Sequence, residues 1–97
     1  MSRIDVENIN HPGKTRKVDA AIYGAVRAAY LDALPASTPG LTIREAESRI
    51  EARLPKSLFG HNAQVGWWTK TVQLDLEAKG LIVRNDERPL RLRRVGS

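Results

Sequence analysis

Residues 66–84 read GWWTKTVQLDLEAKGLIVR, and this stretch decides the fold. Trp68, Val72 and Leu76 recur at every fourth position, so they share one face of a helix. Gly80 suits the position that follows a helix C-terminus, and the apolar residues after it favour a strand. The stretch therefore predicts a helix that begins near Gly66 or Trp67, a glycine stop and a strand.

The same predicted helix carries a second apolar set, formed by Trp67, Leu74 and Ala78. If the first set packs on the preceding helices, the second must contact the N-terminal segment, the connection before the helix or another subunit. Neighbouring tryptophans on a helix are mostly core or interface residues, and stacking on a nucleobase is the less favoured alternative. We therefore assign Trp67, Leu74 and Ala78 to a partner interface.

Two further helices are predicted before this stretch. Asp19 is a favourable N-cap for the first helix, which extends to about residue 34 and ends at a proline. Thr42 and Glu45 have the spacing of a capping box at the start of the second helix. The connection to the third helix, residues 55–65, is longer than the turn of an ordinary helix-turn-helix motif, so the docking angle of the third helix is not fixed by the pattern.

Residues 1–18 are predicted to form an N-terminal arm or hairpin, and residues 19–97 the main domain. Apolar and polar residues alternate near the start of the arm, and a dense turn signal separates them from a short basic segment. That segment contains Lys14, Arg16 and Lys17. These cations either contact nucleic acid or protect an edge strand from aggregation, and the second interpretation is favoured.

The C-terminal part predicts a two-stranded hairpin. Residues 81–84 and 90–95 have strand character, and the polar residues between them favour a turn. Leu90 and Leu92 point to one side of the second strand, whereas Arg91 and Arg93 point to the other.

Composition excludes some classes of protein. The chain of 97 residues suits one domain, contains no cysteine and has a net charge of +5, with the positive excess at its two ends. A basic end segment indicates a polyanionic partner, although charge also serves solubility. No apolar run is long enough to cross a membrane, and a cytoplasmic location is expected.

The residues do not form a recognisable catalytic or cofactor motif. His11 and His61 lie in predicted loops without carboxylates at metal-ligand spacing, and the glycines do not form a phosphate-binding loop. We therefore expect neither an enzyme nor a metal or cofactor site.

A helix that ends in Leu-Glu-Ala-Lys-Gly-Leu-Ile and is followed by a basic hairpin resembles the third helix and wing of winged helix-turn-helix DNA-binding domains. The resemblance covers residues 19–95 and implies an α+β fold: three helices, a C-terminal two-stranded β wing and the short N-terminal hairpin or arm. More narrowly, the chain resembles a small family of functionally uncharacterised bacterial proteins. The shared features are His11-Pro12-Gly13, Val18-Asp19, Tyr23, Leu34-Pro35, Leu58-Phe59, residues 67–80 and Pro89-Leu90-Arg91.

The resemblance implies double-stranded DNA as the partner, because the third helix of such domains usually enters the major groove and the wing touches the backbone or minor groove. The residues then expected at DNA are Thr69, Lys70, Gln73, Arg84, Arg88, Arg91, Arg93 and Arg94. The third helix has no net charge, which weakens sequence-specific reading and favours the wing. The alternative is a winged-helix protein-interaction or dimerisation module without DNA binding, and a homodimer is compatible with both.

Overall fold

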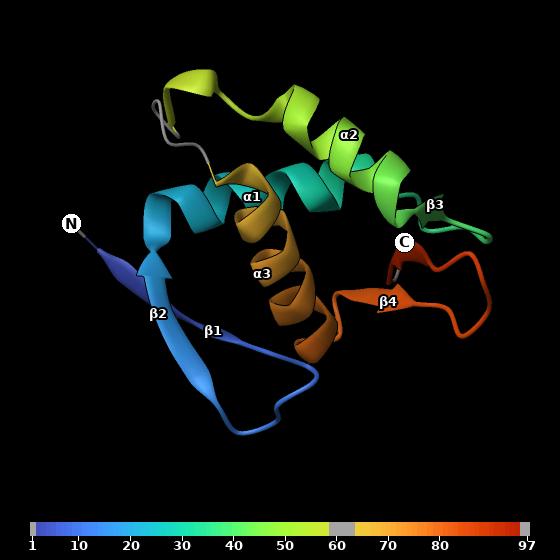
Figure 1. Ribbon diagram of the computed structural model, residues 1–97, viewed down its shortest axis with the longest axis horizontal. Coiled ribbons are helices and arrows are strands. Elements are labelled where there is room, and N and C mark those ends of the chain that lie inside the picture. The colour runs from blue at the N-terminus through green and yellow to red at the C-terminus, as the bar shows by residue number, and fades with distance from the viewer. Residues whose placement is uncertain (1, 59–63, 96–97) are drawn as a thin grey trace.

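The computed structural model describes residues 2–58 and 64–95. Within these residues three α-helices and two small antiparallel sheets form an α+β fold (Figure 1). The helices are α1 (Ala20–Ala33), α2 (Ile43–Arg53) and α3 (Val65–Ala78). A short 3-10 turn, η1 (Lys56–Leu58), follows α2 in the long connection. The third helix thus begins slightly before the predicted start, and Phe59 of the connection lies outside the described residues.

Local capping fixes the starts of the first two helices, as predicted. The Asp19 carboxylate accepts a hydrogen bond of 3.0 Å from the Ile22 amide. At α2, the Thr42 hydroxyl accepts from the Glu45 amide at 3.1 Å, and the Glu45 carboxylate accepts from the Thr42 amide at 2.9 Å. The capping box is therefore complete, and it satisfies backbone donors that have no partner inside the helix.

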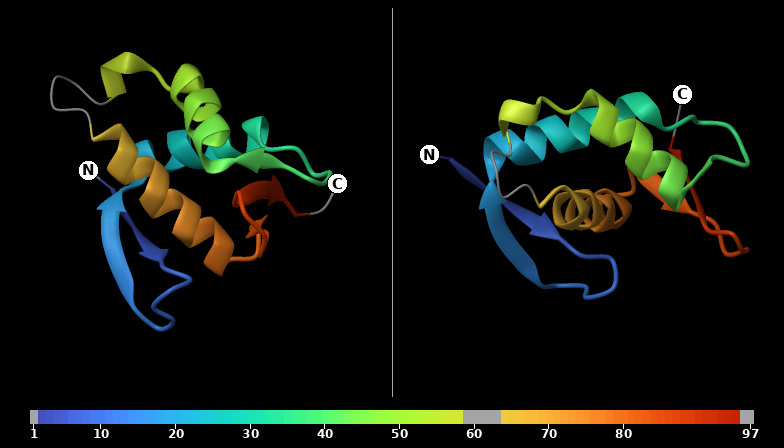
Figure 2. Two further views of the ribbon diagram at one scale, coloured as in Figure 1. Left: turned by 45° about the vertical axis from the view of Figure 1, so that its right-hand side comes forward. Right: turned by 45° about the horizontal axis from the view of Figure 1, so that its top comes forward.

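The N-terminal segment is a hairpin of β1 (Arg3–Glu7) and β2 (Thr15–Asp19). Val6 lies opposite Arg16 and Ile4 opposite Val18, so these four side chains share one face. Val6 and Val18 are buried members of the hydrophobic core. The views in Figures 1 and 2 show the hairpin against α3, on the side away from α2. The third helix is therefore covered from two sides.

The second sheet has three strands in the order β3-β5-β4. Its strands are β3 (Leu41–Thr42), β4 (Ile82–Arg84) and β5 (Arg91–Arg94). The strands β4 and β5 form the predicted hairpin, called the wing below. The strand β3 was not expected, because two residues between a loop and a capping box carry no periodic signal. It pairs with β5 and ties the wing to the start of α2.

The core lies where α3 crosses α1 and α2. Val72 and Leu76 are fully buried, and Trp68 packs half-buried against the same cluster, which confirms the predicted inner face of α3. The side chains of Val26 in α1 and Ile50 in α2 are also fully buried in this core. The wing is anchored to this core by Ile82 and Leu92, whose exposures are 2% and 1%.

Candidate nucleic-acid interface

The wing presents two arginines on its outer face. Leu92 points into the core, and its neighbours in β5, Arg91 and Arg93, therefore point the opposite way. Arg91 donates to the Gly40 carbonyl at 3.2 Å and lies 3.8 Å from the Glu45 carboxylate. Among the described residues, Arg93 has neither a hydrogen bond from its side chain nor an acidic partner. Arg93 is thus the cation of this face that remains available to an external anion.

The other wing arginines differ in their surroundings. The Arg94 side chain donates to the Leu34 carbonyl at 3.2 Å, so it holds the end of α1 against β5. The Arg84 side chain lies 3.4 Å from the Glu77 carboxylate, which is nearly buried. Arg88 lies in the exposed turn, next to the carboxylates of Asp86 and Glu87. Arg84 and Arg94 therefore stabilise the wing, and the acidic neighbours of Arg88 lower the positive potential at the tip.

The outer face of the wing is hollowed. A cavity of about 490 Å³ lies between the wing and the loop before β3. Arg84, Arg91 and Arg93 line it together with Asp86 and Glu87. Because both signs of charge meet here, the cavity itself is a weaker anion site than the outward edge of Arg93.

Burial contradicts the predicted outward orientation of Thr69 and Gln73. Their exposures are 0% and 1%. The Thr69 hydroxyl donates to the Gly66 carbonyl at 3.0 Å, and the Gln73 amide donates to the Glu77 carboxylate at 3.0 Å. These two residues satisfy their polar groups inside the protein. Lys70 is exposed as expected, so it is the one of the three predicted base contacts on α3 that reaches solvent.

Leu74 of the second apolar set is buried, with 8% exposure, and it lines a cavity together with Val6 of the hairpin. Of the three contacts considered for Leu74, the structure thus shows the one with the N-terminal segment of the same chain. Ala78 is half-buried. Trp67 differs, because 39% of it is exposed. The three residues therefore do not form one open apolar surface.

A buried carboxylate, that of Asp75, holds the hairpin on α3. It accepts hydrogen bonds from the Glu7 amide at 2.8 Å and from the Tyr23 hydroxyl at 2.5 Å, and it also contacts the Lys79 ammonium group. Burial, followed by this hydrogen bond to Asp75, raises the pKa of the Tyr23 phenol above its ordinary range. Sequence reasoning missed this centre, although an acidic residue between Leu74 and Leu76 on an apolar helix was its signal.

Other kinds of site have no support in the described ranges 2–58 and 64–95. No group of three or more histidine, cysteine or acidic side chains there is placed to hold a metal ion. The helices in the same ranges are too short or too polar to cross a membrane.

Comparison with known proteins identifies a family. A protein-family model described as a family of unknown function, DUF6958, matches residues 3–92. No curated protein and no solved structure matches the chain significantly. The matched range includes both sheets and all three helices, apart from the last two residues of β5. The chain therefore belongs to the DUF6958 family, a family of unknown function.

Proposed function

We propose that the protein binds double-stranded DNA through the phosphate backbone, with the outer face of the wing as the principal contact. The observation that carries this proposal is the position of Arg93. It projects from a strand that Leu92 anchors in the core, beside the partly engaged Arg91, and it has no acidic partner in the described part of the chain. A guanidinium group on a rigid strand is well suited to a phosphate, because its donors form a planar fork.

The connectivity supports a winged-helix assignment. The elements after the hairpin follow the order α1, β3, α2, α3, β4, β5, and the sheet order is β3-β5-β4. Winged-helix domains share this arrangement, in which a short strand after the first helix pairs with the last strand of the wing. The likeness concerns the fold, and DNA binding rests on the side chains of the wing.

The proposed contact is independent of base sequence. Thr69 and Gln73 are buried, so α3 offers Lys70 as the exposed member of the predicted base-reading set on this helix. A single lysine can contact the edge of one base pair at most, which is too little to specify a binding site. Contacts between arginine and phosphate position a protein on DNA without reading its sequence. Affinity is therefore expected to depend on salt more than on the identity of the duplex.

The test is fluorescence anisotropy with labelled random duplex DNA over a series of salt concentrations. Arg93→Ala is expected to reduce the slope of log K against log salt by about one unit, since one phosphate contact is lost. Arg27→Ala is the matched control: it removes the same charge from an exposed position on α1. An identical slope for wild type and Arg93→Ala, with an unchanged melting curve, would refute the wing as the DNA contact.

A second candidate function, a protein-interaction or dimerisation module, is favoured by one observation. Trp67 on α3 is 39% exposed. Ile4, on the hairpin face that also carries Val6 and Val18, is 37% exposed. Sedimentation equilibrium at several concentrations tests it. A mass that rises with concentration in the wild type, but not in Trp67→Ser, would support a homodimer. A constant monomer mass would exclude this mode of association.

A further inference from the structure

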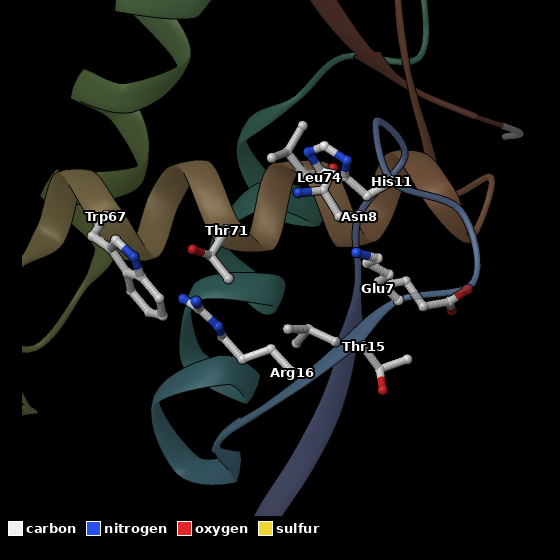
Figure 3. A pocket seen from close by; sticks show the side chains of 10 residues that line it. Glu7, Asn8, His11, Thr15, Arg16, Trp67, Thr71 and Leu74 are labelled. Carbon is white, nitrogen blue, oxygen red and sulfur yellow. The ribbon is translucent and has the colours of Figure 1, made fainter.

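A second cationic site lies on the hairpin, away from the wing. The hairpin and α3 border an open cavity of about 400 Å³. This volume falls in the range of pockets that hold small organic ligands. Figure 3 shows Arg16 reaching from the hairpin toward Trp67 and Thr71 of α3, and Asn8 and His11 near Leu74. The cavity therefore has an aromatic wall, a guanidinium group and several hydrogen-bonding side chains.

The geometry of Arg16 and Trp67 is that of a prepared anion site. The guanidinium carbon of Arg16 lies 5.6 Å from the centroid of the Trp67 ring system, within the range of a cation–π contact. Trp68 meets Trp67 edge to face, with ring centroids 5.2 Å apart and an interplanar angle of 89°. This contact restrains the indole of Trp67. A guanidinium group stacked on an aromatic face keeps its N–H edge available for an anion.

The charges around the cavity favour an anion. In the described part of the chain, neither Arg16 nor Lys14 forms an ion pair with a carboxylate. The acidic side chain that lines the cavity, Glu7, lies 3.5 Å from the Lys79 ammonium group, which it shares with the buried Asp75. Two cations thus border the cavity without a counter-charge of their own.

We propose that this cavity binds a nucleotide, with its phosphate held by Arg16 and Lys14 and its base against the exposed part of Trp67. The combination of an aromatic ring with unpaired cations matches the two chemical parts of a nucleotide. The proposal does not rest on DNA binding by the wing, because different residues on a different sheet carry it.

A neighbouring cavity suggests how a longer ligand would lie. Trp67 also lines a second cavity of about 480 Å³, together with Arg3, Lys17, Asp19 and Trp68, and Lys17 forms an ion pair with Asp5. This second cavity borders the same indole, so it offers space for the next base of a single strand. Free mononucleotides and single-stranded nucleic acid share this chemistry, and the experiment distinguishes them.

The experiment follows tryptophan fluorescence while AMP or a short oligothymidylate is added to the full chain. Both probes are expected to quench fluorescence saturably, because Trp67 lies in the site. Arg16→Ala is expected to weaken binding by about tenfold, the order expected when a charge-assisted hydrogen bond is lost. Trp67→Leu removes the reporter, so isothermal titration calorimetry measures its affinity, which is expected to fall by a similar factor because a stacking contact is lost. Lys14→Ala, on an exposed turn that packs on nothing in the core, gives a variant whose fold is not at risk.

The controls separate this site from the wing. Arg93→Ala should leave both affinities unchanged, and Arg16→Ala should leave the slope for duplex DNA unchanged. Tighter binding of the oligothymidylate than of AMP identifies a single-stranded segment as the ligand, whereas equal affinities identify a free nucleotide. The proposal is overturned if neither probe binds saturably, if inorganic phosphate displaces AMP with the same affinity as AMP itself, or if Arg16→Ala and Lys14→Ala bind like wild type.

Discussion

Replacing Asp75 by alanine should detach the N-terminal hairpin from α3 and destabilise the whole protein. Asp75 is fully buried and accepts from the Glu7 amide and the Tyr23 hydroxyl, beside the Lys79 ammonium group. Loss of the carboxylate leaves the buried Tyr23 hydroxyl without an acceptor, at a cost of about 1–3 kcal/mol. The Glu7 amide is only partly buried and adds about 1 kcal/mol.

The lysine contributes less to this sum. The Lys79 side chain is 32% exposed and also lies 3.5 Å from Glu7, so water and a second carboxylate compensate for the lost partner. Together these terms predict a loss of about 2–4 kcal/mol in the free energy of unfolding, which overlaps the range for removing one partner from a buried charged pair.

Urea denaturation measures this loss, and amide hydrogen exchange locates it. In Asp75→Ala the Glu7 amide should lose its protection together with the β1–β2 hairpin, while amides of α2 lose it only through global unfolding. Asp32→Ala is the control, because that carboxylate is exposed and its ion pair with Arg53 contributes little. A loss below about 1 kcal/mol, or an unchanged exchange rate at Glu7, would refute the assignment of Asp75 as the anchor of the hairpin.

Two further predictions concern positions whose surroundings are equally defined. Gly40→Ala should lower the free energy of unfolding by at least about 2 kcal/mol. The reason is that Gly40 has a φ of +83° and that a Cβ there would lie 2.3 Å from the Leu92 carbonyl oxygen. A melting temperature equal to that of the wild type would contradict this prediction. The pKa values of Tyr23 and Tyr30 are raised, chiefly by burial, so both phenols favour the folded state while protonated. The free energy of unfolding should therefore stay constant at pH values below 10.0, the ordinary pKa of the phenol, and fall at higher pH. Tyr23→Phe should reduce this fall, as measured by urea denaturation at alkaline pH.

Features set by nearby residues could be predicted from the sequence. The starts of α1 and α2 depend on contacts within three residues, through Asp19 and through the pair of Thr42 and Glu45. The inner face of α3 follows from the spacing of Val72 and Leu76, and both are buried as predicted. Such contacts are local, so the pattern that encodes them is complete within one segment.

Features that depend on distant segments could not be predicted. Gln73 and Thr69 are polar, and on a helix taken alone they belong to the solvent-facing side. Burial of Gln73 depends on Glu77, whose carboxylate is in turn paired with Arg84 of the wing. The hairpin docks through a hydrogen bond between Glu7 and Asp75, residues that are 68 positions apart. The periodicity of the sequence does not reveal such pairs, because neither partner is an unusual residue within its own segment.

The docked hairpin changes what α3 can do. In a three-helix domain with a free third helix, polar residues such as Gln73 would be available to bases in a major groove. Here the hairpin contributes Val6 to the core, and Asp75 fastens it to the side of α3 away from α2, beside Tyr23 of α1. The face with Gln73 is closed in turn by Glu77 and the wing. Because α3 is thereby enclosed along most of its C-terminal half, we propose that nucleic acid contacts the edges of the molecule, at Arg93 on the wing and at Arg16 on the hairpin. The two proposed sites, for duplex DNA and for a nucleotide, lie on different surfaces, and the Arg93→Ala and Arg16→Ala variants separate them.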